Sequence, residues 1–127
     1  MKNRVIIFIV ATVGLTLFGY YLHLNFFSKK MIVGTYINTN FDYPSHVAEI
    51  PCYADELELY SDGRFSSSYW GEGEYKISYS IKGTTIDLTY NYEFGKAGFN
   101  TYITRDVFGT PKIVLNKDRN HHYAKVK

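Results

Sequence analysis

The sequence predicts an all-β domain preceded by one N-terminal transmembrane helix, and three observations support this fold class. A charge-free apolar segment lies near the start of the chain, apolar and polar residues alternate from Met31 onward, and turn-forming dipeptides separate the alternating runs. Alternation with a period of two is typical of antiparallel strands that have one buried and one solvated face. We therefore expect residues 1–30 to form a membrane anchor and residues 31–127 to form one all-β extracytoplasmic domain.

The apolar segment spans residues 5–24 and contains His23 but no Asp, Glu, Lys or Arg. As a helix it is about 30 Å long, which matches the hydrocarbon core of a bilayer. The chain after Leu17 offers no small-residue cleavage site of the kind that ends a signal peptide. Cys52 lies too far downstream for a lipoprotein. We expect an uncleaved signal anchor, and a helix buried in a globular core is the alternative.

Basic residues flank this segment on both sides, with Lys2 and Arg4 before it and Lys29 and Lys30 after it. Because the terminal amine adds to Lys2 and Arg4 before the segment, the positive-inside rule slightly favours an N-terminus in the cytoplasm. The β-domain then lies outside the inner membrane, in the periplasm if the cell is Gram-negative. The lone Cys52 excludes an intramolecular disulfide and a zinc site built from several cysteines. We expect it to be a small buried hydrophobic residue.

The alternating runs predict consecutive hairpins. Asp62-Gly63 and Lys82-Gly83 are tight-turn signals, and residues 95–98 are expected to break the pattern. The inward set is expected to contain Leu57, Leu59, Ile77, Ile81, Ile86 and Leu88. Strands are expected near residues 32–37, 56–60, 65–69, 74–81, 85–92, 100–107, 113–115 and 121–126. An antiparallel meander of about eight strands closes into a small barrel or folds as a sandwich, which hides its edges.

A long segment at residues 38–54 interrupts this pattern and contains two prolines. Long loops of this kind are often functional or act as lids, and a short helix at residues 45–50 is an alternative.

Three short motifs resemble the small lipocalin-like β-barrel domains of bacterial envelope proteins. They are GTY at residues 34–36, LELYSDGRF at 57–65 and GEGEY at 71–75. Those domains share a Gly-x-Tyr opening strand, an Asp-Gly hairpin and a Gly-x-Tyr third strand. The ending FGTPKIVLNKDRNHHYAK, at residues 108–125, resembles the tails of small anchored bacterial proteins, some of which are immunity factors against antibacterial toxins. The resemblance implies a barrel and a role in toxin immunity.

Catalytic and metal-binding motifs are missing from the sequence. It has no Gly-x-Ser-x-Gly elbow, phosphate loop or His-Glu-x-x-His helix. His121 and His122 are neighbours, so on a strand they point to opposite faces and cannot share a metal; we expect them at the surface. A nucleophile and base made of Cys52 and His46 would lack a third group. We expect no enzyme, no metal site and no cofactor.

Charge is unevenly distributed along the domain. Residues 42–93 carry ten acidic and three basic residues, whereas residues 94–127 carry two acidic and seven basic residues. A dipolar surface of this kind steers charged partners, although the two halves could instead neutralise each other across adjacent strands. Without the basic residues around the anchor the domain is mildly acidic, which gives no case for nucleic-acid binding.

The acidic half also contains tyrosine and tryptophan, which are good interface anchors. The expected partner-binding residues are Asp55, Glu56, Glu58, Tyr60, Trp70 and Glu72. We expect a membrane-anchored, non-enzymatic protein-binding module, most concretely an immunity protein that neutralises a basic toxin in the cell envelope. One alternative is a lipocalin-like small-ligand carrier or sensor with residues 38–54 as its lid. Another is an accessory subunit of an envelope complex.

Overall fold

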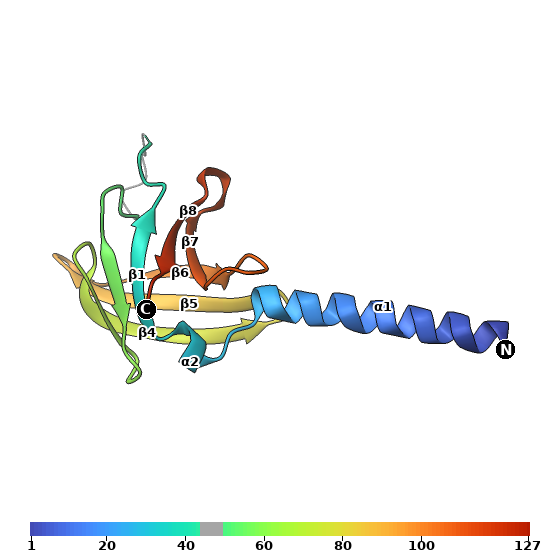
Figure 1. Cartoon of the computed structure of the whole chain (residues 1–127). Helices are drawn as coiled ribbons and strands as arrows, with labels where there is room; N and C mark the ends of the chain where they lie inside the picture. Colours follow the sequence, from blue (N-terminus) through green and yellow to red (C-terminus); the bar gives the residue numbers. More distant parts are fainter. Residues whose placement is uncertain (44–49) are drawn as a thin grey trace.

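The computed structural model describes residues 1–43 and 50–127. A long helix α1 (Lys2–Asn25) projects from one end of a small barrel, and a short helix α2 (Lys29–Ile32) joins the two (Figure 1). The described strands are β1 (Gly34–Thr39), β2 (Glu56–Leu59), β3 (Arg64–Ser67), β4 (Gly71–Ser80), β5 (Gly83–Tyr92), β6 (Gly95–Thr104), β7 (Lys112–Asn116) and β8 (His121–Lys125), with a 3-10 turn η1 (Lys117–Arg119) before the last.

The eight strands close into an antiparallel barrel in which spatial order follows chain order. Each strand pairs with the next, and β8 returns to pair with β1 from Tyr36↔Lys125 to Thr39↔His122. The predicted all-β fold behind one N-terminal helix is thus confirmed, and it is a barrel, not a sandwich. Closure gives each described strand a partner on both sides, although β6 and β7 pair over only two positions, and a closed sheet is protected from edge-to-edge association.

Large side chains fill the barrel interior. On β2 the buried Leu57 and Leu59 alternate with Glu56 and Glu58, which point outward. The same alternation brings residues from other strands to the centre. The buried apolar core consists of Phe27, Ile32, Tyr36, Leu57, Leu59, Phe65, Trp70, Tyr75, Ile86, Leu88, Ile103, Ile113 and Tyr123. These side chains leave the centre packed, so the barrel is held together by burial of its inward face.

Two expectations about strand ends are wrong. Residues 95–98 do not break the sheet; they begin β6 and pair with residues 89–92 of β5. The backbone ladder with β5 outweighs the low strand propensity of this Gly- and Ala-containing stretch. Ile81 does not point inward, because β4 ends at Ser80 and Ile81 lies at the tip of the β4–β5 hairpin with 88 % of its surface exposed.

The long segment after β1 is shorter than expected, because β1 continues to Thr39. Nearly all of the helix considered at residues 45–50 lies outside the described residues. The described flanks of the segment cover one end of the barrel, where Ile50, Pro51 and Asp55 are buried.

Helix α1 is fully described, and none of its residues is buried. It is long and apolar enough to cross a membrane. The expectation of a helix spanning residues 5–24 is therefore met in length and composition, and the alternative of a buried core helix is wrong. Beyond α1 the chain enters the barrel, since Phe27 is buried and its carbonyl accepts a hydrogen bond from the Tyr79 hydroxyl at 2.6 Å.

Candidate functional site

One outer face of the barrel gathers carboxylates from β2 and β4. The register places Glu58 opposite Ser66, and Ser66 opposite Glu72, so the two glutamates lie in one row across β3. Glu56 and Glu74 continue this face along their strands, because alternate residues share a side. The Tyr60 hydroxyl donates to Glu58 Oε2 at 3.3 Å. We call Glu56, Glu58, Tyr60, Glu72 and Glu74 the acidic face.

Arg64 lies within this face, opposite Glu74 in the register, but it is held by another group. Its Nε donates to Asp62 Oδ2 at 2.6 Å, and its backbone N–H donates to Asp62 Oδ1 at 3.1 Å. These hydrogen bonds lower the pKa of Asp62. Arg64 therefore pairs with the carboxylate of its own turn, and the charge of Glu72 also raises the pKa of Arg64.

Two predicted binding residues, Asp55 and Trp70, are not part of this face. Asp55 is 7 % exposed and accepts hydrogen bonds from the backbone N–H groups of Ser68 at 2.9 Å and Tyr69 at 3.2 Å. The Tyr123 hydroxyl also donates to it. Trp70 is 5 % exposed and stacks on Phe99 with ring centroids 5.5 Å apart. Both side chains stabilise the barrel and are out of a partner's reach, so four of the six predicted residues meet on one surface.

Buried polar groups occupy the end of the barrel near residues 50–55. Asn38 Nδ2 donates to the carbonyls of Pro51 at 3.0 Å and Tyr53 at 2.7 Å, so Asn38 Oδ1 is an acceptor. His121 Nε2 lies 2.7 Å from that oxygen and must donate to it. His121 Nδ1 then accepts from the Tyr43 hydroxyl at 2.8 Å. This network specifies a neutral His121 and ties the loop flanks to β1 and β8.

The expectation of surface histidines is therefore wrong, since both His121 and His122 are buried. They do lie on opposite sides of β8, because His121 shares the inward side of the strand with the fully buried Tyr123 and contacts Asn38, while His122 alternates with them. Burial lowers the pKa of each imidazole, and the neighbouring His122 lowers that of His121 further. Among the described residues, no group of three or more His, Cys, Asp or Glu side chains could hold a metal ion.

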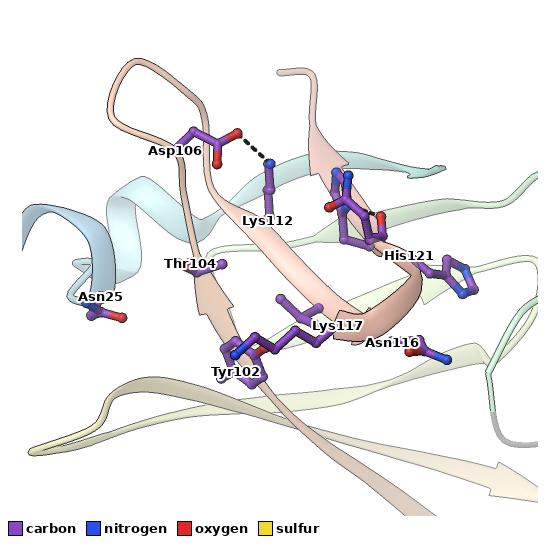
Figure 2. A pocket seen from close by; sticks show the side chains of 11 residues that line it. Asn25, Tyr102, Thr104, Asp106, Lys112, Asn116, Lys117 and His121 are labelled. Carbon is purple, nitrogen blue, oxygen red and sulfur yellow. Dashed lines mark hydrogen bonds and ion pairs between the residues drawn. The ribbon is translucent and has the colours of Figure 1, made fainter. Parts of the chain in front are cut away.

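Sequence reasoning did not find the groove of about 300 Å³ on the outside of β6, β7 and β8 (Figure 2). It forms because β6 and β7 pair over only two positions, Ile103↔Ile113 and Thr104↔Lys112. Lys112 and Lys117 line it, and Lys112 Nζ donates to Asp106 at 2.6 Å. The complete lining is Asn25, Tyr102, Thr104, Asp106, Lys112, Val114, Asn116, Lys117, Asn120, His121 and His122. The signal available in the sequence was the basic excess of residues 94–127.

The acidic face and this basic groove lie on opposite sides of the barrel. In the closed order of strands, β5 separates them on one side and β1 on the other. The two ion pairs found among residues 1–43 and 50–127 are Arg64–Asp62 and Lys112–Asp106, and each joins residues of the same half. These residues thus provide no ion pair by which the acidic half neutralises the basic half.

Cys52 is exposed, in contrast to the expectation of a buried hydrophobic residue. It follows the buried Pro51 in the segment leading to β2, and its thiol donates to the Ile50 carbonyl at 3.8 Å. The partner considered for it, His46, lies outside the described residues.

These features define a class of protein: an antiparallel eight-stranded barrel with a packed interior, a single apolar helix at one end, and charged surfaces of opposite sign on two sides. No known protein family, curated protein or solved structure matches the chain. The resemblance to lipocalin-like envelope domains therefore stays a prediction based on the sequence motifs.

Proposed function

We propose that this chain is a membrane-anchored, non-enzymatic binding protein that holds a basic protein partner on the acidic face of β2 to β4. The observation that carries the proposal is the row of Glu58 and Glu72, which Glu56 and Glu74 extend along their strands. Arg64 lies beside this row, but its side chain is hydrogen-bonded to Asp62 of its own turn. A cationic partner surface gains favourable charge contacts with these carboxylates, and their field speeds its association. Tyr60, which directly follows β2, supplies an aromatic contact at the end of this face.

The anchor in this proposal is α1, with its N-terminus in the cytoplasm and the barrel outside the inner membrane. Its length, its apolar surface and its lack of buried residues support a single crossing. Lys2 and Arg4 at the start support this orientation.

The most concrete form of this function is an immunity protein that neutralises an antibacterial toxin in the cell envelope. The packed interior supports it, because it leaves the outer surface as the place for recognition. The anchor keeps such a protein where an incoming toxin acts.

A small-ligand carrier or sensor is the second candidate, and its proposed site differs from the barrel interior expected for a lipocalin-like carrier. The barrel interior is packed with side chains, so a ligand would occupy the groove between β6 and β8. Lys117 supplies a cation for a small anion there, whereas Lys112 is already paired with Asp106. An accessory subunit of an envelope complex, the third possibility, has no feature of its own in the described residues.

The test uses the full-length chain in lipid nanodiscs as bait in a lysate of its own organism. We expect a basic protein to be retained, with a yield that falls as salt concentration rises. The double variant Glu56→Lys with Glu58→Lys should lower retention by about tenfold or more, since it places two cations against a cationic partner. Lys117→Glu, on the opposite side, is the matched control and should retain the partner.

Unchanged Trp70 emission shows that each variant is folded. Full retention by the glutamate variant would exclude the acidic face as the binding site. Loss of retention only in Lys117→Glu would assign binding to the groove. Recovery of a small anionic molecule without a protein would favour the second candidate.

A further inference from the structure

Two loops at the helix end of the barrel carry exposed apolar side chains. Ile81 forms the tip of the β4–β5 hairpin, and Phe108, in the β6–β7 loop, is fully exposed. Both loops lie beside the last turns of α1 (Figure 1). Large apolar side chains at exposed tips are stabilised when they leave water, so their position relative to the membrane matters.

Hydrogen bonds to α1 fix the height of both loops. The Tyr21 hydroxyl donates to the Ile81 carbonyl, and His23 Nε2 donates to the Val107 carbonyl at 2.9 Å. Arg105 Nε donates in turn to the His23 carbonyl at 2.5 Å. The loop tips are thereby held at the level of Tyr21 and His23.

That level coincides with the edge of the apolar segment. Tyr21 lies four residues before the end of α1, which is about 6 Å along the helix axis. If residues 5–24 occupy the hydrocarbon, Tyr21 and His23 lie at its boundary with the headgroups, where aromatic and amphipathic side chains concentrate. Ile81 and Phe108, held beside them, reach the same depth.

Cations accompany these tips. Lys82 follows Ile81 at the hairpin tip, and Lys29 and Lys30 in α2 are also exposed at this end. Lysines are attracted to an anionic membrane surface, so this end has the chemistry of a lipid-binding surface.

We propose that the helix end of the barrel is a second membrane-binding surface. Ile81 and Phe108 insert into the interfacial layer of the leaflet from which α1 emerges, and Lys82 contacts lipid phosphate groups. This inference rests on the proposed anchoring by α1. It implies that the barrel lies against the bilayer in one orientation and does not reorient on a flexible linker.

Tryptophan fluorescence in nanodiscs containing brominated lipids and an anionic lipid tests this insertion. The native chain has one tryptophan, Trp70, which is buried in the barrel and serves as the internal reference. Ile81→Trp and Phe108→Trp each add a reporter at an exposed tip, where no packing is disturbed. Phe94→Trp is the matched control, since Phe94 is 82 % exposed in the β5–β6 turn at the far end of the barrel.

We expect the added emission at residues 81 and 108 to be quenched at least about twofold, because interfacial groups are buried about 5–10 Å into the membrane surface. The added emission of Phe94→Trp should be unquenched. If either tip variant is quenched no more than Phe94→Trp, the insertion proposal is wrong. Should a variant misfold, a spin-labelled cysteine at the same position in a Cys52→Ser background reports the same depth.

Leu15→Trp separates this inference from the anchor on which it rests. Leu15 lies near the middle of the apolar segment and is exposed on α1. Quenching at residue 15 without quenching at 81 and 108 would overturn the insertion of the loops and leave the anchor intact. An unquenched residue 15 would overturn the anchor itself.

Discussion

At the scale of single residues, Asp55 is the buried charge on which one end of the barrel depends. Its carboxylate accepts hydrogen bonds from two backbone N–H groups, those of Ser68 and Tyr69, and from the Tyr123 hydroxyl. Burial and this contact with Asp55 raise the pKa of Tyr123, so the phenol remains a donor at every physiological pH. Asp55 is one of the expected partner-binding residues, but its hydrogen bonds connect the end of β3 to β8.

Asp55→Ala should therefore destabilise the barrel by about 3 kcal/mol, because it leaves buried donors without an acceptor. Denaturant unfolding of the full-length chain in detergent, followed by Trp70 emission, measures the free energy of unfolding. The neighbouring Glu56→Ala, on the exposed face, is the control and should change stability by less than about 0.5 kcal/mol. Equal effects of the two substitutions would contradict the structural role of Asp55.

The buried histidines make stability depend on pH. Their pKa values are lowered from the ordinary 6.5, chiefly by burial, so the unfolded chain binds more protons than the folded one in the window just below 6.5. The free energy of unfolding therefore rises with pH through this window. The full contribution of the two histidines to stability is present above it. The slope is at most about 1.4 kcal/mol per pH unit for each histidine.

His121→Gln removes one of these titrations while its amide nitrogen can still donate to Asn38. We expect a shallower rise in unfolding free energy between about pH 5 and 7. His122→Gln is the comparison. It removes an imidazole whose pKa the neighbouring Asp106 raises and Lys112 lowers. If neither variant changes the slope, another group controls it.

At the scale of elements, Gly73 sets how closely β3, β4 and β5 approach. A Cβ at this position would lie 2.2 Å from the Thr89 carbonyl oxygen and 2.7 Å from the Phe65 ring. The first contact is with backbone, which cannot rotate away. Gly98, also in a strand next to β5, has its nearest neighbour at 3.5 Å, the Leu88 carbonyl oxygen, which is ordinary contact.

Gly73→Ala should lower the free energy of unfolding by about 2 kcal/mol or more through overpacking. Gly98→Ala should leave it unchanged or raise it by up to about 1 kcal/mol, because alanine restricts the unfolded chain. The same unfolding experiment distinguishes them. Similar losses in both variants would mean that the spacing at Gly73 is not a constraint.

Local alternation predicted strands β2 to β5 to within a few residues, because one face of each is buried and the other is wet. It could not show where a strand ends, so Ile81 was placed inside although it lies at a hairpin tip. It also could not show partners distant in sequence. The burial of Asp55 depends on Tyr123, which is 68 positions away in the sequence. The burial of His121 depends on Asn38, which is 83 positions away.

At the scale of the whole molecule, the two charged sides follow directly from the topology. Consecutive strands are neighbours in a meander barrel, so an acidic half of the sequence becomes an acidic side and a basic half becomes the opposite side. The charge imbalance could therefore be predicted from the sequence. The groove could not, because it depends on the two-residue pairing of β6 with β7.

The orientation of these sides relative to α1 depends on the junction between the helix and the barrel. Thr84 bridges the two parts, since its hydroxyl donates to the Asn25 carbonyl at 2.8 Å and accepts from the Phe27 N–H at 3.2 Å. The Phe27 ring is buried, and the Arg105 guanidinium lies 4.9 Å from its centroid. The helix is thus joined to the barrel by packing as well as by the chain.

Phe27→Ala should release this junction. Removal of a buried phenylalanine costs about 3–5 kcal/mol, and here the loss falls on the segment that links α1 to β1. Trypsin should then cleave at Lys29 and Lys30 about tenfold faster in nanodisc-bound full-length protein, because local opening of the linker becomes more frequent. Phe26→Ala is the control, since Phe26 is only half-buried and its ring packs on Tyr21 of α1. Unchanged cleavage of Phe27→Ala would mean that the Phe27 side chain does not hold the barrel to the helix.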